Sequence, residues 1–282
     1  MVAIPTFMVI GASKCGTSTV CGHLRRHPDI FMVTPKEPHF FSMDERFAKG
    51  IEWYEALYDG ATDEKQLGEG SNTYTIKEVY PQAANRIFKY KKDLRLVYCV
   101  RNPLPRIESC WLEYRAHLGE TVHYDFNQAL KVNKDRLIDS TNYWRQLEVY
   151  RELFGEENIH VIFFEDLLQN PDAVMQSCFA FLGVDTSVPL NNPDLHVGTT
   201  KGRFAASNTL SRLRENAMFR FAVRLAPAQM RYAIRNRLFL KRIDTRPTWS
   251  ASRREWVASQ LREDTLRFLE FYGKPVDYWE LD

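Results

Sequence analysis

The stretch Gly11-Ala12-Ser13-Lys14-Cys15-Gly16-Thr17-Ser18-Thr19 follows the apolar run Thr6–Ile10 and leads directly into a helical pattern over Thr17–Arg26. A glycine-framed turn between a strand and a helix lets successive backbone N–H groups point at one spot, where the helix N-terminus adds partial positive charge. Lys14 and the hydroxyl groups of Thr17, Ser18 and Thr19 would complete such a site. A turn that needs glycine only for its backbone is the alternative, but these side chains favour a phosphate-binding loop, which we call the cradle (residues 11–19).

Two later apolar runs have the same character as the first, Leu94–Val100 and Ile159–Phe164. Their side chains show little polar–apolar alternation, which is typical of strands covered on both faces in a parallel sheet. Helical periodicity separates or follows these runs at Pro103–Leu118, Asn142–Phe154 and Pro171–Leu182, the last with Asn170 as its expected N-cap and Gly183 as its expected C-cap. This alternation predicts an α/β, P-loop-like three-layer fold with a central parallel sheet flanked by helices.

The last third of the chain has a different pattern. Asn191–Gly202 is polar and predicts a loop, Ser207–Leu240 has helical spacing with a break at Pro227, and Ser250–Tyr272 predicts a long final helix. The sequence contains no internal repeat and no Gly/Ser-rich linker. It therefore predicts one domain over residues 1–282, with a helical insertion at about 204–246.

The insertion is basic, although the whole chain carries a net charge of only +2. Residues 201–246 contain 12 Lys and Arg against 2 Asp and Glu. A basic nucleic-acid-binding protein is one interpretation of such a segment. An apolar stripe instead favours an amphipathic helical hairpin with a solvated basic face, so we expect no nucleic-acid partner. The stripe consists of Leu210, Leu213, Ala217, Phe221 and Leu225.

The absence of certain sequence features predicts where the protein is located and whether it binds a metal. The N-terminal run Phe7–Ile10 is too short for a signal peptide, and no stretch approaches the ~20 apolar residues that a membrane span needs. The five cysteines are odd in number and include no Cys-x-x-Cys pair. We therefore expect a cytoplasmic protein without a membrane span. The cysteines and the seven histidines also show no metal-ligand spacing, so we expect no metal.

The order of residues in the cradle bears on the kind of phosphate compound. A nucleoside triphosphatase loop reads Gly-x-x-x-x-Gly-Lys-[Ser/Thr], with lysine directly after the second glycine. Here Thr17 takes that place and Lys14 lies inside the loop. This favours a nucleotide with one 5′-phosphate. A P-loop kinase or NTPase remains the enzyme alternative, and it would require magnesium and the missing lysine.

Further motifs accompany the cradle in a specific order. With His27-Pro28-Asp29-Ile30 and Lys36-Glu37-Pro38-His39-Phe40-Phe41, the chain resembles the PAPS-dependent sulfotransferase superfamily, in its bacterial and heparan-sulfate-type branch. PAPS is 3′-phosphoadenosine 5′-phosphosulfate, and PAP is the product left after transfer. The resemblance continues through Glu69–Tyr74, Arg101-Asn102-Pro103 with Ser109, Thr200–Arg203 and Leu266–Trp279.

This resemblance implies a sulfotransferase that moves a sulfuryl group from PAPS to a hydroxyl, or less readily an amine, of a small-molecule, glycan or lipid acceptor. The resemblance covers the insertion poorly. Because the apolar stripe of the insertion must be covered, we predict that the insertion packs next to the acceptor cleft and governs acceptor choice, with a homodimer contact or a purely structural role as the alternatives. Heparan-sulfate-type enzymes often carry lysine where Gly70 stands here. That departure puts a heparan-like polysaccharide acceptor in doubt.

The same resemblance assigns roles to particular residues. The cradle would hold the 5′-phosphosulfate end of PAPS, and Lys14 would also stabilise the leaving phosphate. Arg101, at the expected end of a strand, and Ser109 would bind the 3′-phosphate, although an isolated arginine there could merely pair with a surface carboxylate. Glu37 is the expected general base and His39 the alternative. The nucleotide-binding residues are then Lys14, Cys15, Gly16, Thr17, Ser18, Thr19, Arg101, Ser109, Lys201, Gly202 and Arg203.

Overall fold

The computed structural model describes residues 3–116, 122–190, 204–206, 240–242 and 247–281. These residues form a parallel sheet with the strand order β2-β3-β1-β4-β5. The strands are β1 (Phe7–Gly11), β2 (Ile30–Met32), β3 (Gln66–Gly70), β4 (Arg95–Val100) and β5 (Ile159–Phe163). Since β1 lies in the middle, its carboxyl end stands beside those of β3 and β4, which is where open α/β sheets bind ligands.

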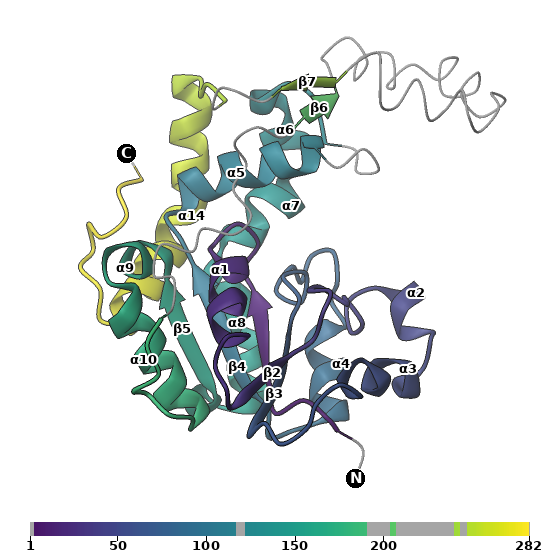
Figure 1. The fold of residues 1–282 in the computed structure, drawn as a ribbon. Coiled ribbons are helices and arrows are strands. Elements are labelled where there is room, and N and C mark those ends of the chain that lie inside the picture. Colours follow the sequence, from purple (N-terminus) through teal and green to yellow (C-terminus); the bar gives the residue numbers. More distant parts are fainter. Residues whose placement is uncertain (1–2, 117–121, 191–203, 207–239, 243–246, 282) are drawn as a thin grey trace, which may run out of the picture.

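Helices cover both faces of this sheet (Figure 1). One face carries α1 (Thr17–Leu24) and α10 (Pro171–Leu182), where the rings of His27 and Phe179 lie 4.6 Å apart. The other face carries α4 (Ala83–Tyr90) and α8 (Tyr143–Phe154), which pack together, and α14 (Ala251–Phe271) packs on α8. The remaining elements are α2 (Asp44–Phe47), α3 (Ile51–Glu55), η1 (Ala56–Tyr58), α5 (Pro103–Ala116), α6 (Phe126–Val132), α7 (Lys134–Leu137), η2 (Asp139–Thr141), η3 (Glu156–Asn158) and α9 (Phe164–Gln169).

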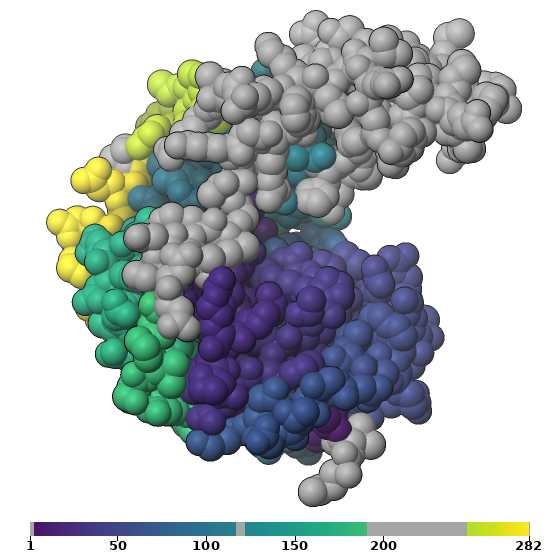
Figure 2. Space-filling model, in the orientation of Figure 1, coloured from purple at the N-terminus to yellow at the C-terminus, as the bar shows by residue number. Residues whose placement is uncertain are grey.

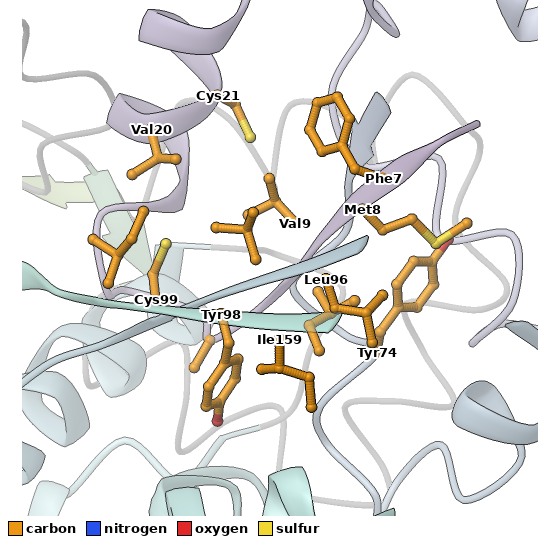
Figure 3. Packing of buried hydrophobic residues seen from close by; sticks show 14 of the residues in the cluster. Phe7, Met8, Val9, Val20, Cys21, Tyr74, Leu96, Tyr98, Cys99 and Ile159 are labelled. Carbon is orange, nitrogen blue, oxygen red and sulfur yellow. The ribbon is translucent and has the colours of Figure 1, made fainter. Parts of the chain in front are cut away.

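The central strands are buried because apolar side chains project from both of their faces. In Figure 3, Val9 and Cys99 point toward Val20 and Cys21, while Tyr98 points to the opposite side of the strands. All five residues of β1 are buried. Each fully buried aliphatic side chain contributes roughly 1.5–3 kcal/mol to folding. The continuous apolar runs are thus explained by two covered faces, as the sequence predicted.

A second apolar cluster joins α5, α6, α7 and α14 above the carboxyl ends of the strands (Figure 1). Figure 2 shows the N-terminal residues, purple and blue, as one continuous surface below the teal residues of these helices. The helix α5 lies at the boundary, because its Leu104 and Ile107 belong to the second cluster while other residues of α5 reach the cradle. The described residues contain no helix long and apolar enough to cross a membrane.

The predicted α/β architecture is confirmed, and so is the capping of α10, where the Asn170 side chain accepts from the Ala173 N–H and Gly183 adopts a left-handed φ of 72°. The sequence did not reveal β2 and β3. It also placed Leu240 in a helix, which is wrong, because Leu240 begins β7 (Leu240–Arg242), paired antiparallel with β6 (Phe204–Ala206). The rest of the insertion and the whole of the predicted loop Asn191–Gly202 lie outside the described residues.

Candidate active site

The cradle connects β1 to α1 with its backbone N–H groups left open. Thr19 and Val20 donate back to the Gly16 carbonyl, which starts the helix. In the described part of the chain, the N–H groups of Lys14, Gly16, Thr17 and Ser18 have no backbone acceptor. The first N–H groups of a helix lack intrahelical partners, so they are available to an anion. A phosphate group, which the sequence predicts here, would find these N–H groups available.

Glycine at position 16 is required by both conformation and space. Gly16 has a φ of 84°, in the left-handed region that disfavours side chains. A Cβ atom there would lie 2.7 Å from Cδ2 of Phe164. The Phe164 ring also lies 4.7 Å from the guanidinium carbon of Arg101. The ring therefore packs against the cradle and the arginine, and it holds both at the same edge of the sheet.

Within the cradle, Lys14 and Cys15 differ in where their side chains go. The Lys14 ammonium pairs with the Glu113 carboxylate of α5 at 2.9 Å. The Cys15 side chain is fully buried, with Sγ 3.5 Å from the Tyr143 hydroxyl, and burial raises the pKa of this thiol to about 11. The Cys15 N–H donates to the Ala12 carbonyl. Cys15 is thus a packing residue here, and its thiol does not serve the anion site.

Arg101 follows β4 and reaches the cradle, as predicted. Its Nη1 donates to the Lys14 carbonyl at 3.4 Å. Its backbone is fixed because the Tyr143 hydroxyl donates to the Arg101 carbonyl at 2.7 Å, and the following N–H, of Asn102, donates to Glu165 at 2.9 Å. Ser109 lies on α5 directly before Cys110, whose Sγ contacts the Ser13 carbonyl. The predicted residues Lys201, Gly202 and Arg203 lie outside the described residues.

The loop after β2 brings Glu37 to the cradle. The Glu37 N–H donates to the Gly70 carbonyl at 3.0 Å, and Oε1 of Glu37 accepts from Lys36 at 2.6 Å and from Asn72 at 2.9 Å. Nζ of Lys36 also donates to Oγ1 of Thr17, in the first turn of α1, at 3.3 Å. One lysine thus links the candidate base to the anion site.

His39 lies beside Glu37 and is held at three points. Its Nε2 is 3.6 Å from Oε2 of Glu37, its Nδ1 is 2.9 Å from Oγ1 of Thr73, and its backbone N–H donates to Oγ of Ser71 at 3.0 Å. Burial lowers the pKa of His39 below its ordinary value, although the Glu37 carboxylate opposes this. The imidazole is therefore neutral at pH 7.

Thr73 also anchors the His39 ring. Oγ of Ser42 donates to the His39 carbonyl at 3.2 Å and lies 2.6 Å from Oγ1 of Thr73, which in turn contacts Nδ1 of His39. These contacts orient the ring so that its Nε2 faces the Glu37 carboxylate.

Three residues of the site share an unusual backbone conformation. In the described ranges, Lys14, Glu37 and His39 are the non-glycine residues with positive φ, at 66°, 69° and 55°. Such conformations cost energy and persist where the surroundings fix them, which is frequent at active sites. They are the same three residues that the sequence assigned to catalysis.

Although Gly70 has no side chain, Lys36 supplies a positive charge next to it. A Cβ atom at Gly70 would lie 2.7 Å from Sγ of Cys21 and 3.4 Å from Cε of Lys36. The stem of Lys36 thus passes over Gly70 and carries its ammonium to Glu37 and Thr17. The absence of a lysine at position 70 therefore does not remove the positive charge from this part of the site.

Sequence reasoning missed the residues that hold the candidate catalytic groups. Glu69 of β3 is completely buried, and its carboxylate accepts from the hydroxyls of Tyr74 at 2.5 Å and Ser71 at 2.8 Å. The rings of Phe40 and Phe41 pack with Tyr54 rather than in the anion site. Because Glu69 lies in a strand with the sequence Gln-Leu-Gly-Glu-Gly, no apolar run marked it as buried, and its hydrogen-bond partners could not be identified from the sequence. The other missed residues are Lys36, Asn72, Thr73, Arg106, Glu113 and Tyr143.

Comparisons with known proteins identify relatives of the chain. The model of the sulfotransferase domain family matches residues 5–219. The chain is 29% identical over 209 residues to heparan sulfate glucosamine 3-O-sulfotransferase 5 of Mus musculus, covering 71% of this chain and 58% of that protein. It is 32% identical over 117 residues to human heparan sulfate glucosamine 3-O-sulfotransferase 6, covering 42% and 32%. The chain thus spans little more than half the length of the first of these relatives.

Solved structures share the fold. A sulfotransferase from Alicyclobacillus acidocaldarius superposes with a TM-score of 0.69 at 24% identity, over 99% of each chain. The sulfotransferase domain from the curacin biosynthetic pathway superposes with a TM-score of 0.53 at 16% identity, over 93% of this chain and 98% of that one. At these identities the likeness establishes the architecture, including the central parallel sheet.

Proposed function

This chain belongs to the sulfotransferase family, and we propose that it transfers a sulfuryl group from PAPS to a hydroxyl group of an acceptor. The observation that carries the proposal is that the anion site in the cradle adjoins the candidate base. Lys36 bonds both Thr17 of the cradle and the Glu37 carboxylate, so the anion site and the candidate base are within one side chain of each other. A sulfuryl donor and its acceptor must meet at such a junction.

The donor half of the proposal assigns the nucleotide to the cradle and the end of β4. The open N–H groups and Lys14 would receive the 5′-phosphosulfate, where charge-assisted hydrogen bonds are strongest. Arg101, beside the cradle, and Ser109 would receive the 3′-phosphate, which ATP and AMP lack. A lysine after the second glycine, which a triphosphatase needs, is missing, so a P-loop kinase is not favoured.

The chemical step breaks the bond between sulfur and the bridging oxygen of the 5′-phosphate and forms a bond between sulfur and the acceptor oxygen. The leaving phosphate gains the negative charge, which Lys14 would stabilise. The acceptor hydroxyl loses its proton to Glu37, our proposed base. His39 supports this role, because its neutral Nε2 lies 3.6 Å from Oε2 of Glu37 and can orient the same proton.

For the acceptor we propose the hydroxyl of a glycan, the class named in the relatives' own descriptions. Lys36 supports a negatively charged glycan, because it places an ammonium next to Glu37. A small-molecule or lipid hydroxyl is the competing acceptor class. The acceptor half of the site is built from the loops after β2 and β3.

The test is transfer of ³⁵S from labelled PAPS to a panel of sulfated and unsulfated glycans, phenols and lipids. We expect labelled product without added magnesium. Lys14→Ala should lower turnover by about 10²–10³, the usual cost of one donor to the developing charge. Lys77→Ala is the matched control, since Lys77 pairs with Glu148 away from the cradle. Tighter binding of ATP than of PAP, measured by calorimetry, would contradict the proposal.

A further inference from the structure

Arg106 of α5 is a buried arginine behind the cradle. Only 1% of the surface of this residue is exposed to solvent. Its Nε donates to the Ser13 carbonyl at 3.0 Å, and its Nη1 donates to the hydroxyls of Ser140 at 3.1 Å and Thr141 at 2.5 Å. All three acceptors are neutral. In the described part of the chain, no carboxylate forms an ion pair with this guanidinium.

A buried cation with only neutral partners is unfavourable unless another charge offsets it. The position of Arg106 indicates which charge that is. Its Nε contacts the back of the loop whose front carries open N–H groups. An anion held at the front of the cradle would lie close to this guanidinium, at a distance where a desolvated charge acts strongly.

The contact with Ser13 also fixes the direction of one peptide group. The Ser13 carbonyl receives Nε of Arg106, and Sγ of Cys15 and of Cys110 lie 3.6 and 3.8 Å from it. In a trans peptide the following N–H points the opposite way from the carbonyl. The Lys14 N–H is therefore directed away from Arg106, and it is one of the open N–H groups of the cradle.

This peptide needs such a restraint because Lys14 has a φ of 66°. A residue with a side chain leaves that conformation readily when nothing holds it. A rotated peptide would turn the Ser13 carbonyl toward the anion and repel it. The arginine keeps the donor group forward, and the Ser140 and Thr141 hydroxyls keep the arginine in place.

We propose that Arg106 is a positioning residue for the sulfuryl donor: it holds the Ser13–Lys14 peptide with its N–H facing the 5′-phosphosulfate and places a buried positive charge behind it. This rests on the proposed function, because the anion is taken to be the 5′ end of PAPS. Arg106 would thus act on the 5′ end of the nucleotide, whereas Arg101 acts on the 3′ end.

The test measures the contribution of the 5′-phosphate alone. Calorimetry gives the dissociation constants of PAP and of 3′-AMP, which lacks that phosphate, and the dissociation constant of 3′-AMP divided by that of PAP isolates its contribution. We expect Arg106→Met to lower this ratio about tenfold, the effect of one lost charge-assisted hydrogen bond. A purely structural arginine would weaken both ligands equally. Arg95→Met is the matched control, because Arg95 also donates to a carbonyl, that of Leu182, far from the cradle.

A second variant covers the case in which Arg106→Met fails to fold. The double variant Ser140→Ala/Thr141→Val keeps the charge of Arg106 and removes the hydroxyls that hold it, and we expect it to lower the same ratio about threefold. If the wild-type protein binds PAP but the ratio is unchanged in every folded variant, the proposed role of Arg106 is wrong and the proposed function still stands. Wild-type protein that binds neither nucleotide overturns the proposed function, and this inference with it.

Discussion

The ammonium of Lys14 lies 2.9 Å from Oε2 of Glu113, so the lysine assigned to the leaving phosphate is paired with a carboxylate of α5 in this structure. Both side chains are largely buried, at 13% and 20% exposure, which limits screening by solvent. A donor that takes over this lysine must displace the carboxylate or accept it as a neighbour. We therefore expect Glu113 to oppose donor binding.

Replacing this carboxylate tests that opposition. We expect Glu113→Gln to tighten PAP binding several-fold, about three- to tenfold, because a negative charge near the phosphosulfate is removed. Calorimetry at low and high salt measures the effect, which should shrink at high salt. Glu148→Gln, which removes the partner of Lys77, is the control. Unchanged or weaker PAP binding would show that Glu113 instead orients Lys14 for the donor.

The assignment of the base can be tested by its pH dependence. We expect Glu37→Gln to lower turnover by about 10²–10⁴ while PAP binding stays nearly intact, since a base acts only in the chemical step. Burial holds the pKa of His39 below 6.5, so the imidazole is neutral at pH 7. On the acid side, the rate should therefore begin to fall only below pH 6.5, where His39 takes up a proton; this fall is the acid limb of the rate profile. His39→Asn should weaken this acid limb. If His39→Asn abolishes activity and Glu37→Gln retains it, the two roles are reversed.

Gly16 offers a test of the cradle itself. We expect Gly16→Ala to destabilise the fold more than Gly273→Ala, although both glycines have positive φ, at 84° and 66°. The added methyl meets Phe164 at position 16 and nothing within 4 Å at position 273. The conformational cost of about 1–2 kcal/mol is common to both, and crowding adds about 1–3 kcal/mol at Gly16 only. Urea unfolding measures both, and equal losses would contradict the packing of Phe164 on the cradle.

Buried Glu69 makes stability depend on pH. Burial raises the pKa of Glu69 from 4.5 to about 7, against the hydrogen bonds from Tyr74 and Ser71. The folded protein thus keeps a proton that the unfolded chain has lost, so this contribution is complete below pH 4.5 and is lost as the pH rises through 7. Between pH 4.5 and 8 the wild type should lose about 3 kcal/mol relative to Glu69→Gln.

Denaturant unfolding of both proteins at several pH values measures this difference. Tyr58→Phe is a suitable control, because the Tyr58 hydroxyl bonds Tyr54 and leaves Glu69 in place. Parallel stability curves for wild type and Glu69→Gln would mean that Glu69 is ionised throughout the range.

Local patterns in the sequence were enough to predict the cradle and the burial of three strands on both faces. The strands β2 and β3 escaped because β2 has three residues, and because β3 reads Gln-Leu-Gly-Glu-Gly, with glycines and a buried glutamate in place of a β-branched run. Gly68 is needed where the Phe7 ring passes, since a Cβ atom there would lie 2.2 Å from the ring. Propensity cannot show such a tertiary requirement.

The partners of the candidate catalytic residues could not be predicted from the sequence, for a related reason. Lys14 meets Glu113 and His39 meets Thr73 across long stretches of chain, and only the packing of the helices and loops brings them together. The buried role of Arg106 was equally hidden, because a single arginine five residues after Arg101 reads as a surface charge. The sequence thus identified the candidate donor-binding residues better than the residues that hold them in place.

The strand order separates two tasks in space. The loops after β2 and β3, which carry Glu37, His39 and Thr73, lie on one flank of β1, while β4 and α5, which carry Arg101 and Arg106, lie on the other. The two flanks meet at the cradle. Under the proposed function, the first flank would serve the acceptor and the second flank the nucleotide. Exchanging the loops of the first flank alone should then redirect the enzyme to another acceptor.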